Sequence, residues 1–69
     1  MAVARALVAK AVCIEDAVGV ARELGYPVRI TIFAGSAEQT VDGIEDEATL
    51  YQLVASFPAT ALAYVRLTS

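Results

Sequence analysis

The stretch IEDAVGVARELGYPVRITIFA, residues 14–34, decides the fold, because it predicts a helix followed directly by a strand. The apolar residues of its first half recur at intervals of three and four, which places them on one face of a helix. Gly25 can adopt the left-handed conformation that ends helices, and Pro27 cannot continue one. From Val28 the apolar residues alternate, which is typical of a strand with one buried face. The predicted helix stripe consists of Ile14, Ala17, Val18, Ala21 and Leu24.

The alanine-rich residues 2–10 fit either a strand or a helix. If the helix stripe continued backwards from Ile14, Lys10 would lie on its buried face, and burying an unpaired charge is costly. We therefore expect a first strand over residues 2–10, then a break, and a helix over residues 14–25. One continuous helix from Ala2 to Leu24 is the alternative.

Residues 28–42 predict a hairpin. Gly35-Ser36 separates two strand-like runs, 28–34 and 37–42, and is typical of a two-residue type II′ turn. The turn predicts which residues face each other, since the register of a hairpin follows from its loop. Gln39 opposite Ile32, on the inner face, is the pair that lacks a physical rationale. The predicted pairs are Ala34–Ala37, Phe33–Glu38, Ile32–Gln39, Thr31–Thr40, Ile30–Val41 and Arg29–Asp42.

A second helix and a last strand complete a single small α+β domain over residues 1–69. Residues 46–57 carry an apolar helix stripe that ends before Pro58, and residues 60–67 alternate like a strand. The order β-α-β-β-α-β predicts a two-layer, open-faced sandwich, with both helices on one side of a four-stranded antiparallel sheet.

The ferredoxin-like fold is the commonest one with this element order, and it is our first expectation for the strand order. In that fold the third strand is central, whereas residues 37–42 form the most polar strand here and favour an edge. The strand order of histidine phosphocarrier proteins puts the third strand at the edge and is the alternative. Similarity to that family is limited to the fold, because this chain contains no histidine to phosphorylate.

The composition indicates a domain that needs a source of stability besides its own core. A chain of 69 residues buries too little surface to be more than marginally stable alone. One cysteine and no histidine leave no intrachain disulfide and no structural zinc site, and we expect no cofactor. With 58% hydrophobic residues, association with another chain is the remaining source of stability. We therefore expect a homo-oligomer, and specifically a homodimer.

The net charge and the hydropathy of the chain argue against two classes of binding partner, nucleic acids and membranes. The net charge of −3 argues against nucleic acid, which proteins bind through clustered lysines and arginines. No apolar run reaches membrane-spanning length, and Lys10 interrupts the N-terminal run before it reaches the length of a signal-peptide core. We therefore expect no membrane partner and cytoplasmic residence.

Cys13 and Gly19 are the two unusual residues at the first helix. Cys13 lies just before the helix, where the helix dipole can lower the pKa of a thiol, but no histidine is present to activate it. We therefore expect Cys13 to be a small buried residue. A glycine in a helix costs about 1 kcal/mol relative to alanine, so we expect Gly19 to mark a close packing contact.

Four acidic residues gather near the start of the second helix, and we expect them to be structural. Carboxylates stabilise helix starts without any metal, and this stretch lacks the alternating oxygen spacing of a calcium loop. The first of the four also faces Arg29 in the predicted hairpin. The cluster consists of Asp42, Glu45, Asp46 and Glu47.

Apolar and basic side chains are predicted on the open face of the sheet. Exposed aromatic and basic residues on such a sheet are similar to the RNA-recognition motif, whose strands stack bases. That family carries aromatic and basic residues on its third strand, and residues 37–42 have none. An apolar open face is better suited to packing against another chain. The predicted interface residues are Phe33, Leu62, Tyr64, Arg29 and Arg66.

These observations favour a non-enzymatic interaction module, which acts through self-association or partner docking on its open sheet face. The first alternative is a small-molecule-binding regulatory domain similar to ACT domains, which share this element order, although residues 11–14 lack the glycine-rich loop expected there. The second alternative is a small dimeric α+β barrel enzyme, whose acid–base chemistry would fall to buried carboxylates or Tyr64. No catalytic, cofactor-binding or metal-binding residue is assigned.

Overall fold

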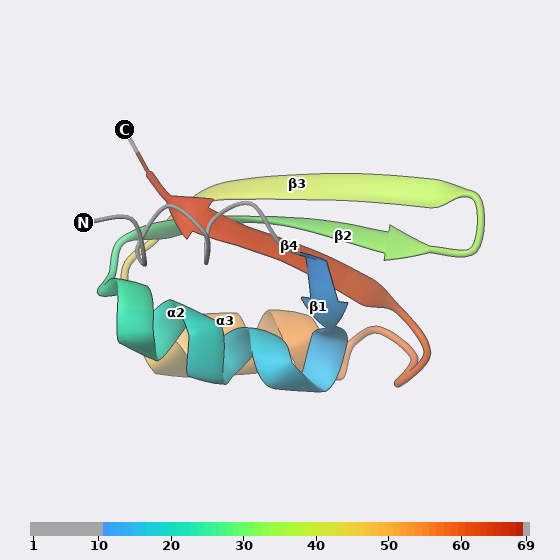
Figure 1. The fold of residues 1–69 in the computed structure, drawn as a ribbon, viewed down its shortest axis with the longest axis horizontal. Helices are drawn as coiled ribbons and strands as arrows, with labels where there is room; N and C mark the ends of the chain where they lie inside the picture. Colours follow the sequence, from blue (N-terminus) through green and yellow to red (C-terminus); the bar gives the residue numbers. More distant parts are fainter. Residues whose placement is uncertain (1–10, 69) are drawn as a thin grey trace.

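A computed structural model describes residues 11–68 and shows two layers, with a four-stranded antiparallel sheet above two helices (Figure 1). The α+β class and the open-faced arrangement predicted from the sequence are confirmed. In chain order the elements are β1 (Ala11–Cys13), the 3-10 helix η1 (Ile14–Asp16), α2 (Ala17–Leu24), β2 (Val28–Ala34), β3 (Ala37–Ile44), α3 (Glu47–Ala55) and β4 (Leu62–Leu67).

The first helix follows the predicted apolar stripe. Ile14, Ala17 and Ala21 are buried against the sheet, and Gly25 ends α2 with a φ of +90° while its N–H donates to the carbonyl oxygen of Ala21 at 2.9 Å. The prediction for Gly19 is wrong. This glycine is exposed, and a Cβ atom added to it would meet no atom of the described residues within 4 Å, because it lies on the solvent side of α2.

β1 covers part of the stretch where the sequence predicted a break. The strand expected over residues 2–10 lies outside the described residues, and the alternative of one continuous helix is wrong over residues 11–13, which form β1. The prediction that Cys13 is buried is also wrong, because this residue still belongs to the strand and follows its alternation. Its partner on β4 is Leu62, so Cys13 faces away from the helices.

The hairpin register predicted from the turn is confirmed over five pairs, from Ala34–Ala37 to Ile30–Val41. Gly35 has a φ of +63°, the positive value that primed hairpin turns require at their first central residue. Beyond these pairs β3 carries one extra residue, a bulge at which Gly43 has a φ of +69°. The strand therefore continues to Ile44 instead of ending at residue 42.

The tip of the β2–β3 hairpin extends beyond the helix layer (Figure 1). This geometry explains the unexpected pair, since Gln39 lies opposite Ile32 on the inner side of the sheet and is nevertheless exposed. The polar side chain therefore remains in contact with solvent, and its placement costs no buried hydrogen bond.

The strand order is β1-β4-β2-β3, which differs from the ferredoxin-like expectation. The polar strand β3 lies at an edge, as the alternative order places it. The composition of β3 explains this position, because residues 37–40 are all exposed and an edge strand leaves its polar side chains in water. β2 and β4 are the central strands, and their buried residues are Val28, Ile30, Ile32, Ala63 and Val65.

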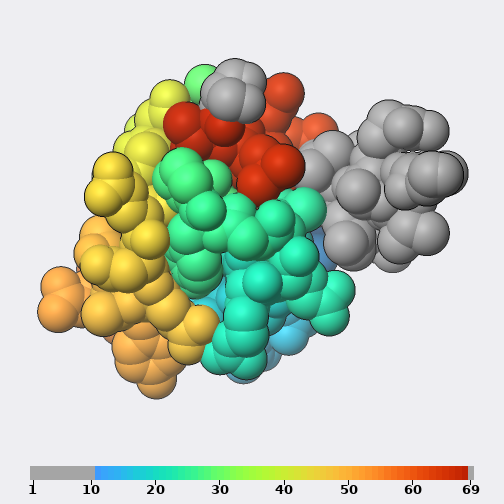
Figure 2. All heavy atoms as spheres, turned by 90° about the vertical axis from the view of Figure 1, so that its left-hand side faces the viewer, coloured from blue at the N-terminus to red at the C-terminus, as the bar shows by residue number. Residues whose placement is uncertain are grey.

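The core lies between the sheet and the helices. In the end-on view of Figure 2, α2 (teal) and α3 (yellow to orange) lie side by side beneath the red β4. Leu50 of α3 is fully buried, whereas Leu67 at the end of β4 is 48% exposed. The buried core residues are Ile14, Ala17, Ala21, Val28, Ile30, Ile32, Ile44, Leu50, Ala61, Ala63 and Val65.

Candidate interaction surface

The open face of the sheet carries the side chains that alternate with the buried ones. Partners in an antiparallel ladder point to the same side of the sheet, so the strand pairing fixes which residues are neighbours on this face. Two continuous rows cross all four strands. The first row is Cys13, Leu62, Phe33 and Glu38, and the second is Ala11, Tyr64, Thr31 and Thr40.

Phe33 and Leu62 form the apolar centre of the first row. They are direct partners on the two central strands, and they are 39% and 47% exposed. Tyr64 is half-buried one row further along β4. The structure therefore brings together the three apolar residues that the sequence assigned to this face. Cys13, which the sequence placed in the core, joins them at the β1 edge.

A polar network borders the apolar centre at the far end of β2. Arg29 donates from Nη2 to Asp42 Oδ2 at 3.2 Å, while Asp42 Oδ1 accepts from the Thr68 hydroxyl at 3.0 Å and from the Gly43 N–H at 2.9 Å. The Arg29 hydrogen bond is the largest cause that holds the pKa of Asp42 below its usual value. This carboxylate therefore connects β2, β3 and the residue after β4. Arg29 and Asp42, the sixth pair predicted for the hairpin, form an ion pair, although the bulge interrupts the ladder at this point.

Arg66 completes the set of predicted interface residues. It is exposed on β4 directly opposite Arg29. Like charges in opposing positions repel each other, and the carboxylate of Asp42 offsets the charge of Arg29. The face thus has an apolar end around Phe33 and a basic end around Arg66.

Two more of the clustered acidic residues have local partners. Asp46 is the N-cap of α3, where its Oδ1 accepts from the Thr49 N–H at 2.8 Å, and this hydrogen bond lowers the pKa of its carboxyl. Glu47 accepts two hydrogen bonds from Arg22, at 3.0 and 2.8 Å, and this pair lowers the pKa of Glu47. Across residues 11–68, no group of three metal-ligating side chains lies close enough together to hold an ion.

Tyr26 shows an unusual environment after the end of α2. Its hydroxyl oxygen is buried and has no hydrogen-bond partner among residues 11–68. Burial is the largest cause that raises the pKa of this phenol. The side chain otherwise packs against the core, so its hydroxyl contributes an unsatisfied polar atom there.

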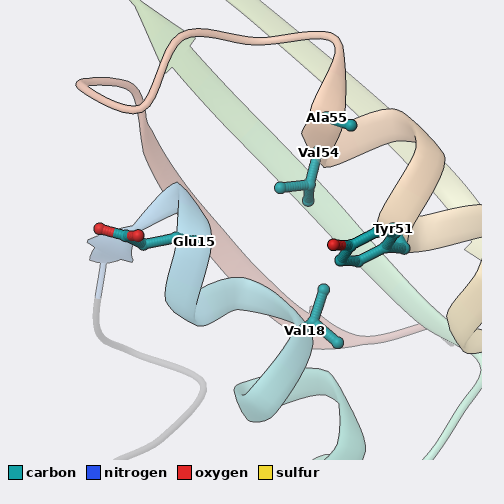
Figure 3. Close-up of a pocket in the computed structure, with 5 residues that line it drawn as sticks. All are labelled: Glu15, Val18, Tyr51, Val54 and Ala55. Atoms are coloured by element: carbon teal, nitrogen blue, oxygen red, sulfur yellow. The ribbon is translucent and has the colours of Figure 1, made fainter.

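A groove of about 300 Å³ lies between the helices, on the face opposite the open sheet (Figure 3). Sequence reasoning missed it, because it needs the relative placement of two helices. The signal that was available is Tyr51, an aromatic residue that lies beside the apolar stripe of α3 and is 65% exposed. The groove is lined by Glu15, Val18, Tyr51, Val54 and Ala55.

Comparison with known protein families, curated proteins and solved structures finds no match for this chain. Of the helices within residues 11–68, none combines the length and the apolar character that a membrane span requires.

Proposed function

We propose that this chain is a small non-enzymatic interaction module, which forms a homodimer through the open face of its sheet. The observation that supports this proposal most directly is the pair Phe33–Leu62, two large apolar side chains that adjoin each other on the central strands and remain exposed. Aromatic and aliphatic residues in such positions supply much of the binding energy at protein interfaces. Tyr64 extends the same apolar area.

The edges of the sheet are less suited to association than its face. β3 carries Glu38, the ion-paired Asp42 and the bulge at Gly43, and charges and bulges are the features with which proteins prevent pairing at edge strands. Within residues 11–68, β1 comprises Ala11–Cys13, so the part of this edge that the structure describes offers a short ladder. A second copy is therefore better accommodated on the open face.

The size of the face predicts how strong the association is. Strands about 4.8 Å apart and about 20 Å long give a four-stranded sheet a footprint of roughly 400 Å², so two copies bury roughly 800 Å² together. Stable complexes bury at least about 1,200 Å². We therefore expect a reversible dimer with a micromolar dissociation constant, in which Arg29 and Arg66 form part of the polar rim.

The reactivity of Cys13 tests this proposal, because its thiol lies on the same face beside Leu62. The rate of its reaction with a water-soluble maleimide should fall as the protein concentration rises through the micromolar range. Phe33→Glu should react at the fast rate at every concentration, while Glu23→Lys, an exposed change on α2, should behave like the wild type. A wild-type rate that is independent of concentration and equal to that of Phe33→Glu would refute self-association on this face.

The two alternatives gain no specific support. The similarity to ACT domains rests on the shared element order β-α-β-β-α-β alone, and the dimeric α+β barrel enzyme stays an expectation from the sequence. Cytoplasmic residence and the exclusion of nucleic acid and membrane partners stay predictions from the sequence.

A further inference from the structure

We propose that the groove between α2 and α3 binds an arginine side chain of a partner protein, with the arginine stem in the groove and its guanidinium group at the rim. This surface is on the helix layer, opposite the proposed dimer face, so the inference is independent of self-association. Its lining combines an aromatic ring, aliphatic walls and one carboxylate.

The shape of the groove suits a long side chain. In Figure 3, Val18 and Val54 point toward the centre of the groove from the two helices, and the ring of Tyr51 lies across it. Its volume of about 300 Å³ is at the lower limit for ligand sites, which favours a single side chain over a nucleotide-sized ligand. Glu15 lies at the rim, with its carboxylate directed outward. A ligand with an apolar stem and a polar head at the rim matches this arrangement.

The charge of the surroundings favours a cation. Glu15, which lines the groove, is exposed, and so is Asp16, the next residue of η1. The three cations within residues 11–68 all lie elsewhere: Arg22 pairs with Glu47 at the other end of the two helices, and the remaining two are on the sheet. The start of α2 and the end of α3 both lie at this end of the helix pair, so their opposite dipoles offset each other and the carboxylates set the sign.

An arginine fits this chemistry better than a lysine. The planar guanidinium group stacks on an aromatic ring while it pairs with a carboxylate, whereas an ammonium group is compact and strongly hydrated. Tyr51 offers an exposed ring for such stacking, and Glu15 offers the carboxylate.

The test uses the whole chain, labelled with 15N, and two small probes of nearly the same shape, n-butylguanidinium and the neutral n-butylurea. Millimolar n-butylguanidinium should shift the backbone amide signals of the lining residues Val18, Tyr51, Val54 and Ala55. It should bind about two- to five-fold more tightly than n-butylurea, which is the range expected for an exposed ion pair. Glu15→Gln should abolish this preference, whereas Glu23→Gln, a matched change on α2 outside the groove, should keep it.

Three results would overturn the inference. Equal binding of the two probes would show that charge has no role in the groove, and tighter binding of n-butylammonium would assign the groove to lysine. Shifts that are absent or spread over the surface would show that the groove is not a binding site. Tyr51→Ala, which replaces an exposed side chain, should keep the fold and lose the shifts caused by both probes.

Discussion

Gly19 and Gly43 offer a direct test of the structure, because the same substitution at the two positions has opposite predicted effects. Both glycines have room for a Cβ atom, with no atom within 4 Å. They differ in backbone conformation: Gly43 has a φ of +69° at the bulge of β3, whereas Gly19 lies within α2. The effect of alanine is therefore set by the backbone alone.

Gly19→Ala should stabilise the protein by about 0.5–1 kcal/mol, the difference between glycine and alanine inside a helix. For a domain of this size the melting temperature should rise by roughly 2–8 °C. Gly43→Ala should destabilise the protein by about 1–2 kcal/mol, because a side chain at positive φ is strained. Thermal unfolding followed by circular dichroism, with all three proteins at one concentration, measures both effects. A loss of stability in Gly19→Ala would refute the placement of this residue on the solvent side of α2 and would support the close contact expected from the sequence.

Three further predictions follow from the described contacts. Leu50→Ala should lower the free energy of unfolding by about 2–5 kcal/mol, because Leu50 is fully buried, whereas the adjacent Tyr51→Ala should lower it far less. If chemical denaturation gave similar losses for the two variants, the assigned buried face of α3 would be contradicted. Tyr26→Phe should leave the stability unchanged or raise it, since it removes a buried hydroxyl without a partner; a clear loss would mean that this hydroxyl is hydrogen-bonded in solution. The pKa values of Asp42, Asp46 and Glu47 are lowered in the folded protein, so on acidification these carboxylates are protonated in the unfolded chain first. The melting temperature should therefore be constant above about pH 5 and fall as the pH drops through about 4. A melting temperature that rises on acidification would contradict the direction of these shifts.

The local elements could be predicted because their signals lie within a few residues. The turn at Gly35-Ser36 is enough to give the hairpin pairs, since a two-residue loop fixes the register by itself. The 3.6-residue periodicity of the apolar residues is enough to predict the buried face of α2. The ion pair of Arg29 with Asp42 was also expected from the hairpin, whereas the bulge beside it was not. The three apolar residues of the open face could be named for the same reason, because strand alternation alone decides their side.

The remaining features depend on contacts that are distant in the sequence. The strand order depends on the pairing of β4 with β1 and β2, which no local sequence pattern reveals. The polarity of β3 indicated only that this strand lies at an edge of the sheet. The position of Cys13 depends on one residue at the border between β1 and η1, and a shift of one residue reverses the face of a strand side chain. The groove depends on how Val18 and Tyr51 are placed across two helices.

Sedimentation velocity over a range of concentrations tests the central claim, that the open sheet face mediates self-association, most directly. The wild type should change reversibly from monomer to dimer through the micromolar range. Phe33→Glu and Tyr64→Glu should remain monomers with an unchanged circular dichroism spectrum, and Glu23→Lys should follow the wild type. A wild type that stays monomeric up to hundreds of micromolar, or a folded Phe33→Glu that dimerises as the wild type does, would contradict the account.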